Sequence, residues 1–208
     1  MDDARLLAAV DSQEITNLIM RWGQARDRGD WDVLRDCFHS DGTIQIAWIT
    51  GPGHEFIDKS AERIAEFGPG EHAKHIMGTP NIELNGARAF CQSHVNHAAR
   101  VIIEGIEFDW EFWGQFVDLV ERRDDNIWRL FKRTMVYEKD RLDPVHVQTL
   151  PDGFFDIDAF TGFLPEVRFL SWRLTKKGIP PSKQIITIGS PKEAALLAES
   201  KAWLGKSV

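Results

Sequence analysis

A run of long strand patterns in the middle of the chain constrains the fold more than any other feature. Residues 77–84, 87–104, 108–122 and 127–137 have sheet-like rather than helical patterning. Residues typical of turns separate the four segments: Asn85-Gly86, Gly105 and Asp124-Asp125-Asn126. We therefore predict a meander of long antiparallel strands over this part of the chain.

A helical pattern lies close to the start of the chain. Asp11 and Glu14 have the spacing of a capping box. Apolar residues then recur on one helical face: Ile15, Leu18, Ile19 and Trp22. A helix should therefore cover residues 12–28, and Gly29 should end it.

Two more helices and one strand are predicted before the meander. Asp30 is a suitable N-cap for a short helix, residues 43–49 are β-branched and apolar enough for a strand, and residues 54–67 have a helical pattern. Helices followed by a meander indicate an α+β fold, in which the helices cover one face of a curved antiparallel sheet. Because a strongly bent sheet capped by helices encloses space, we expect a pocket between the two layers.

The length of 208 residues is about one and a half times that of a usual domain. We place the main domain at residues 1–143 and a C-terminal extension at residues 144–208, which has a different texture and contains helical patterns at 166–177 and 192–204. The first of these helices is too apolar for a free tail. We expect it to pack on the main domain, on a neighbouring subunit or over the pocket mouth.

Charge and hydropathy exclude several classes of function. The net charge of −7 opposes contacts with nucleic-acid phosphates. No apolar stretch is long enough to span a bilayer, and the start of the chain lacks the positive end and apolar centre of a secretory signal. We therefore expect a soluble cytoplasmic protein that binds neither nucleic acid nor membranes.

The sequence gives little support for a metal or a cofactor. Cys37 and Cys91 have no metal-type spacing and are expected to be buried free thiols. Two pairs of histidines lie three residues apart: His72 with His75, and His94 with His97. On a strand this spacing sends the side chains to opposite faces. Nucleotide-binding and serine-hydrolase motifs are lacking, so we expect neither metal nor cofactor.

The aromatic residues are unevenly divided into 13 Phe, 8 Trp and one Tyr. Several of them could line an aromatic cavity, or could instead pack in the core or at a subunit interface: Trp48, Phe108, Trp110, Phe112 and Trp113. The one phenol, Tyr137, lies at the end of the last predicted strand. We therefore predict a pocket that binds aromatic rings and in which histidine, rather than tyrosine, transfers protons.

Three segments resemble the SnoaL-like branch of the NTF2-like superfamily: Asp27-Arg28-Gly29-Asp30-Trp31-Asp32-Val33-Leu34-Arg35, Lys74-His75-Ile76-Met77-Gly78-Thr79 and Asn126-Ile127-Trp128-Arg129-Leu130. The resemblance covers residues 10–140 and implies an NTF2-like cone. Its closest patterns are those of scytalone dehydratases and hexachlorocyclohexane dehydrochlorinases. Fold alone does not fix the activity, because this superfamily contains lyases, isomerases, hydrolases and non-catalytic binders.

The resemblance implies roles for four residues. It makes His75 the base that removes a proton from carbon, oriented by Asp27, and a histidine pKa near neutrality suits that task. His97 matches a second active-site histidine. Arg133 matches an active-site arginine that could stabilise an oxyanion or receive a leaving group. Strand alternation places Arg133 on one face with Arg129, Phe131 and Met135, so a solvated position is equally open for it.

Departures from the family pattern narrow the range of candidate activities and leaving groups. The two tyrosines that hold a water in scytalone dehydratases correspond to Arg26 and Trp48, which argues against that activity. The lysine of the dehydrochlorinases corresponds to Trp22, which argues against a halide leaving group. Six residues are expected to contact the substrate: Trp22, Arg26, Trp48, Trp110, Trp113 and His94. Strand parity leaves it open whether His94 or His97 faces the pocket.

Together these observations predict a cofactor-independent lyase acting on a small hydrophobic aromatic substrate. The resemblance extends to lyases of lignin-derived diaryl compounds, so either water or formaldehyde is a candidate leaving group. An isomerase or an epoxide hydrolase of the same fold is the first alternative. The second is a non-catalytic assembly subunit like the β subunits of dioxygenases. The resemblance also implies a homotrimer or a homodimer.

Overall fold

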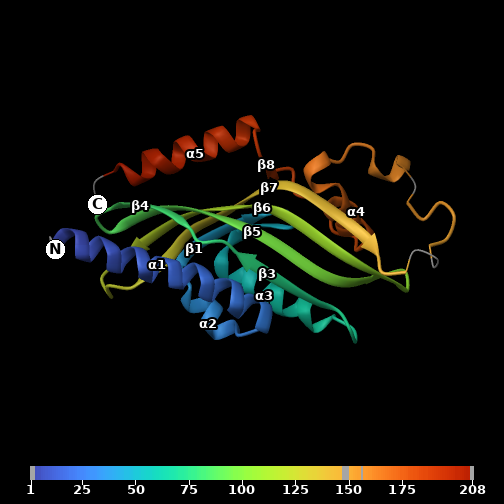
Figure 1. Ribbon diagram of the computed structural model, residues 1–208, viewed down its shortest axis with the longest axis horizontal. Coiled ribbons are helices and arrows are strands. Elements are labelled where there is room, and N and C mark those ends of the chain that lie inside the picture. Colours follow the sequence, from blue (N-terminus) through green and yellow to red (C-terminus); the bar gives the residue numbers. More distant parts are fainter. Residues whose placement is uncertain (1–2, 147–149, 156, 207–208) are drawn as a thin grey trace.

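The computed structural model describes residues 3–146, 150–155 and 157–206. Three N-terminal helices, α1 (Asp3–Arg28), α2 (Trp31–Asp36) and α3 (Gly53–Ala65), lie together below one face of a long sheet (Figure 1). Within the described residues, eight strands form this sheet: β1 (Phe38–Ile46), β2 (Ile49–Pro52), β3 (His72–Met77), β4 (Asn81–Asn85), β5 (Arg88–Ile103), β6 (Ile106–Arg122), β7 (Trp128–Pro144) and β8 (Ile186–Thr187). The predicted α+β class with a strongly curved sheet is confirmed.

Helix α1 begins earlier than the sequence predicted, at Asp3. Asp11 lies inside the helix, so its prediction as part of a capping box was wrong. Its carboxylate instead accepts hydrogen bonds from Arg122 at 2.5 Å and from the Trp128 indole at 3.0 Å. Asp11 therefore ties α1 to the sheet. Gly29 ends the helix with a φ of +73°, as predicted.

The sheet has the order β2-β1-β7-β6-β5-β3, with β4 on β5 and β8 on β7. The predicted meander is antiparallel from β3 to β7, whereas β1 and β8 run parallel to β7. The strand predicted at 77–84 corresponds to the shorter β4, whereas β3, which ends at Met77, was not predicted as a strand. The two strands pair with successive halves of β5. Pro80 lies in the break between them, because proline has no N–H to donate to a ladder.

Two irregularities between β6 and β7 mark places where the regular ladder is interrupted. The register shifts between Trp113 and Gly114 and again between Leu119 and Val120. Each shift leaves one extra residue on β7, Glu138 and Phe131 respectively, and such bulges increase strand bending. A Cβ on Gly114 would overlap the carbonyl oxygen of Val136, so only glycine lets β7 approach this closely.

Gly114→Ala is expected to lower the free energy of unfolding by about 3 kcal/mol, because β6 and β7 would have to separate locally. Chemical denaturation of the purified variant measures this change. Gly51→Ala is the matched control, since its added Cβ would meet its nearest neighbour at 3.8 Å. A Gly114→Ala protein as stable as the control would contradict this account of the close approach.

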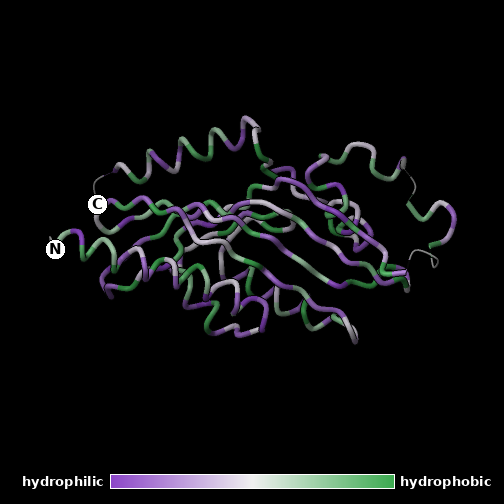
Figure 2. The backbone as a smooth tube through the Cα atoms, in the orientation of Figure 1, coloured by the Kyte–Doolittle hydropathy of each residue, from purple (hydrophilic) through white to green (hydrophobic). Residues whose placement is uncertain are grey.

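The two faces of the sheet have separate apolar cores. The concave face packs against α1, α2 and α3, whereas α5 (Pro191–Leu204) lies on the opposite face (Figure 1). Hydrophobic and hydrophilic residues alternate along the long strands, as Figure 2 shows. Helix α5 covers residues of β5, β6 and β7 in the smaller core: Phe90, Val117, Leu119 and Val136.

The C-terminal extension is built into the main sheet rather than left as a tail. Its strand β8 pairs with β7, and its helix α4 (Arg168–Lys176) packs against the end of the sheet. Asp140 of β7 accepts a hydrogen bond from the first-turn N–H of Leu170 at 2.7 Å. Burial raises the pKa of Asp140 to about 6, and the Leu170 N–H opposes this rise. Helix α4 is therefore fixed by the main domain.

Cys37 and Cys91 are buried free thiols, which confirms their prediction. Among the helices in the described ranges, none combines the length and the apolar character required to cross a membrane.

Candidate functional site

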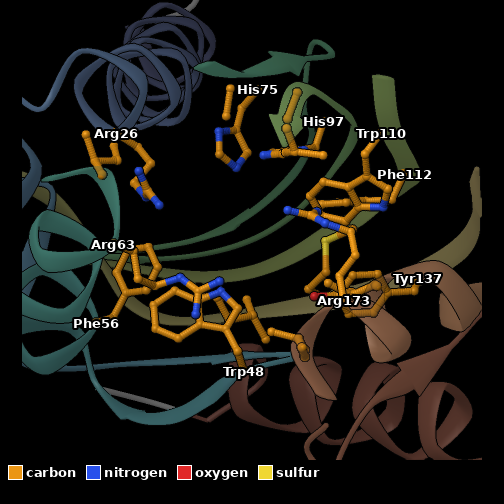
Figure 3. A pocket seen from close by; sticks show the side chains of 18 of the residues that line it. Arg26, Trp48, Phe56, Arg63, His75, His97, Trp110, Phe112, Tyr137 and Arg173 are labelled. Atoms are coloured by element: carbon orange, nitrogen blue, oxygen red, sulfur yellow. The ribbon is translucent and has the colours of Figure 1, made fainter. Parts of the chain in front are cut away.

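A cavity of about 130 Å³ lies between the concave face of the sheet and helices α1, α3 and α4 (Figure 3). Its wall is largely aromatic: Trp22, Trp48, Phe56, Trp110, Phe112, Phe116 and Tyr137. Six basic side chains also line it: Arg26, Arg63, Arg173, Lys177, His75 and His97. The sequence predicted a pocket at this place, and the structure contains one there.

Asp27 and His75 are in direct contact at the cavity wall. Nδ1 of His75 lies 2.6 Å from one carboxylate oxygen of Asp27, and the backbone N–H of His75 donates to the other oxygen at 2.7 Å. The side chain of Asp27 is 14% exposed and that of His75 is 12% exposed. Because the carboxylate accepts from Nδ1–H, the lone pair of neutral His75 is on Nε2. The imidazole projects into the cavity in Figure 3.

The sequence of α1 permits this contact. Asp27 lies in its last turn, and Gly23 lies one turn earlier against β3. A Cβ on Gly23 would come within 2.9 Å of Cγ of Met77 and 3.8 Å of the His75 carbonyl oxygen. The absence of a side chain at Gly23 therefore lets α1 approach β3 closely enough for Asp27 to reach both the ring and the backbone of His75.

The surroundings of His75 favour its neutral form. Burial lowers its pKa from the usual 6.5, and the hydrogen bond with Asp27 opposes that change without reversing it. The ring is held edge-on against Trp22, at 5.7 Å between centroids. A neutral, oriented imidazole with a free Nε2 can accept a proton from a ligand in the cavity.

Of His94 and His97, it is His97 that faces the cavity. It lies directly opposite His75 in the β3–β5 ladder, and its ring stacks on Phe112 at 4.8 Å between centroids. Burial, followed by the charges of His75 and Arg173, holds the pKa of His97 well below the usual range. Its Nδ1 is buried without a hydrogen-bond partner in the described part of the chain. A neutral His97 could therefore offer a hydrogen bond to a ligand.

Two residues expected at the substrate lie elsewhere. His94 is exposed and Trp113 contacts Lys139 at 4.4 Å, and neither lines the cavity. Trp113 is opposite Asn96 in the β5–β6 ladder, next to the cavity-facing pair of His97 and Phe112, so alternation turns it outward. Their assignment as substrate contacts was wrong. The other four expected contacts, Trp22, Arg26, Trp48 and Trp110, do line the cavity.

Arg133 lies neither in the cavity nor in a solvated position, which were the two possibilities that the sequence left open. It is fully buried, and it donates two hydrogen bonds to Asp118 at 2.7 and 2.8 Å. Its guanidinium carbon lies 4.2 Å from the centroid of Trp22 and 4.3 Å from that of Phe116. Both rings line the cavity, whereas Arg133 does not. The assignment of Arg133 to direct contact with a leaving group is therefore corrected to support of the wall.

Sequence reasoning missed several lining residues, among them Tyr137, Arg63 and Arg173. Tyr137 was predicted at the end of a strand, but β7 continues to Pro144 and places the phenol at the cavity, where its oxygen accepts from the Ala47 N–H at 3.0 Å. Burial raises the pKa of Tyr137, so its hydroxyl stays protonated. Arg63 lies two turns after Phe56 on α3, and Arg173 lies beside Leu170 and Leu174 on α4. This helical spacing from buried apolar residues was an available signal.

The sequence model of the SnoaL-like domain family matches residues 8–134 of this chain. An uncharacterised protein of Emericella nidulans is 26% identical over 156 residues, which are 72% of this chain and 63% of that protein. This chain therefore aligns with less than two-thirds of that relative's length.

Solved structures are similar to the fold. One, from Novosphingobium aromaticivorans and provisionally named a scytalone dehydratase, has a TM-score of 0.57 and 21% identity over 71% of this chain and 93% of its own. LinA has a TM-score of 0.55 and 20% identity, covering 71% of this chain and 96% of its own. A Kribbella flavida protein has a TM-score of 0.54 and 18% identity, covering 67% and 93%. At these identities the likeness shows the fold, which is NTF2-like.

Proposed function

Because the chain belongs to the SnoaL-like domain family, whose fold supports several chemistries, we propose a function from the site itself: a cofactor-independent lyase that acts on a small aromatic molecule. The observation that carries this proposal is the Asp27–His75 pair at the cavity wall. A carboxylate on Nδ1 leaves Nε2 as the proton acceptor and stabilises the imidazolium that forms.

The proposed reaction is an elimination. Nε2 of His75 accepts a proton from a substrate carbon, and the electron pair of that C–H bond forms the new double bond as the C–O bond breaks. The His75 imidazolium then gives its proton to the leaving hydroxyl, which departs as water and leaves His75 neutral again. The hydroxyl of Tyr137 and a ring N–H of His97 are among the cavity groups that can donate hydrogen bonds to the departing oxygen. The π system of an aromatic substrate spreads the developing charge.

The cavity volume favours a substrate with one ring. An apolar cavity of about 150 Å³ in another protein holds a single benzene molecule, and this cavity is about 130 Å³. Trp48, Phe56 and Trp110 offer ring faces or edges within that space. We therefore prefer loss of water from a one-ring substrate to release of formaldehyde from a diaryl compound.

The test is turnover of one-ring aryl compounds that carry a hydroxyl β to an acidic C–H, followed by NMR in D₂O. The proposal predicts water elimination by the wild-type protein and none by His75→Gln. Deuterium exchange at carbon without elimination would identify an isomerase that uses the same base. Equal rates for both proteins on every compound turned over would rule out His75 as the base.

The pH dependence of kcat/KM should reflect the lowered pKa of His75. Activity should be constant at neutral pH and fall only as the pH drops through a midpoint below the usual 6.5, because protonated imidazole cannot accept a proton. Asp27→Asn removes a carboxylate that raises this pKa, so the midpoint of the residual activity should move lower still. A midpoint above 6.5 in the wild-type protein would contradict the burial effect.

A further inference from the structure

Three arginines from three different helices converge on the cavity. Arg26 comes from α1, Arg63 from α3 and Arg173 from α4 of the C-terminal extension. All three line the cavity, and Figure 3 shows their guanidinium groups directed toward its centre. They line the same cavity as His75, whose Nδ1, and not its Nε2, is bonded to Asp27.

None of these three guanidinium groups has a carboxylate partner among the described residues. No described carboxylate oxygen lies within 4.0 Å of them, and they make no hydrogen bond with the described part of the protein. The described lining contains no Asp or Glu. Asp27, beside Arg26, is engaged by His75, and the acids that act on Arg63 and Arg173, namely Glu66, Glu71 and Asp140, form no ion pair with them. Arg133, by contrast, has Asp118 as a bidentate partner.

The three charges persist although they are sheltered from water. Burial lowers the pKa of Arg26 and of Arg173 to about 10, and it also lowers the pKa of Arg63. Arg63 is close enough to contribute to the lowered pKa of both other arginines. All three groups are still protonated at neutral pH. A cluster of sheltered positive charges without anions is costly, and a bound anion would relieve that cost.

Aromatic rings hold the arginines in place. The guanidinium carbon of Arg63 is 4.7 Å from the centroid of Trp48, and that of Arg173 is 4.1 Å from the centroid of Trp110. Arg26 lies 5.9 Å from the centroid of Phe56. Contact with a ring face orients a guanidinium group without using its N–H donors, which remain available for a carboxylate.

We propose that the cavity binds an aromatic carboxylate, whose ring packs among Trp48, Phe56 and Trp110 and whose carboxylate accepts hydrogen bonds from Arg26, Arg63 and Arg173. This inference names the substrate class of the proposed lyase and rests on the same cavity. A carboxylate is planar and has two acceptor oxygens, which match the planar donors of arginine. A single ring with one carboxylate also suits the volume of about 130 Å³.

The test compares calorimetric binding of benzoate with that of benzamide, which has nearly the same shape and no charge. Wild-type protein should bind benzoate about 10- to 100-fold more tightly than benzamide, the range expected for hydrogen bonds to a charged group. Each of the variants Arg26→Met, Arg63→Met and Arg173→Met should weaken benzoate binding by about 10-fold. The same variants should leave benzamide binding nearly unchanged.

Arg28→Met is the matched control, since it removes one exposed positive charge from the same helix as Arg26. It should bind benzoate as the wild-type protein does. The three cavity variants should also melt at the wild-type temperature or above it, because each removes a sheltered charge that has no partner. Arginines with only a structural role would instead lower the melting temperature when replaced.

Benzoate binding no tighter than that of benzamide, including undetectable binding of both, would overturn this inference. So would equal benzoate affinities in the wild-type protein and all three cavity variants. The proposed function is separable through His75→Gln, which should retain benzoate binding while losing turnover. If that variant keeps both, the anion site stands and the base assignment fails.

Discussion

His75→Gln should lower kcat/KM by about 10²- to 10⁴-fold, the usual contribution of a general base. Glutamine approximates the reach of histidine and can still bond to Asp27, but its amide cannot accept a proton at neutral pH. The cavity should therefore remain formed while proton removal fails. Steady-state kinetics on a substrate found in the D₂O experiment gives the ratio, and circular dichroism verifies the fold.

The matched control is His94→Gln. His94 is exposed on the same strand as His97 and lies outside the cavity, so its replacement should leave kcat/KM unchanged. Asp27→Asn should lower the rate less than His75→Gln does, because the imidazole remains but loses its fixed tautomer. Equal activity of His75→Gln and His94→Gln would remove His75 from the mechanism.

Asp118→Leu should lower the free energy of unfolding by about 3–5 kcal/mol, because it leaves the Arg133 charge buried without a partner. Both side chains are fully buried, and Nη1 of Arg133 already has no partner among the described residues. Arg133 also supports Trp22 and Phe116 from behind, so the cavity wall should loosen. Urea denaturation with ligand-free protein measures the loss.

The double variant Asp118→Leu with Arg133→Met provides the comparison for this pair. Removing both charges leaves no unpaired ion, so much of the stability lost in Asp118→Leu should return. The coupling energy of the cycle then measures the cost of the unpaired charge. A single variant as stable as the double variant would show that Arg133 does not depend on Asp118 for its burial.

Local sequence patterns were sufficient for much of the fold. The alternation and turn signals of the meander, the apolar face of α1 and the stop at Gly29 all depend on residues close in sequence. Boundaries were less well predicted, because tertiary contacts can extend an element. Asp11 belongs to a longer helix whose position is fixed by Arg122 and Trp128, which are more than a hundred residues away.

The candidate site was predicted in part, and through resemblance rather than spacing. Asp27 and His75 are 48 residues apart, and only the packing of α1 on β3 brings them within 2.6 Å. The choice between His94 and His97 could not be made from parity alone. The pairing of His75 with His97 across the β3–β5 ladder identifies His97 as the one in the cavity, because directly opposite residues share a face of the sheet.

The sequence by itself determined the α+β class, the separate C-terminal helices and the kinds of side chain available for proton transfer, since these follow from periodicity and residue type. Only the tertiary structure decided which side chains share the cavity. Strand alternation placed Phe131 with Arg133, but the bulge at Phe131 turns it toward Trp203 while Arg133 lies against Trp22. Likewise, an arginine carries its charge in any sequence, but whether it has a carboxylate beside it depends on how distant elements pack.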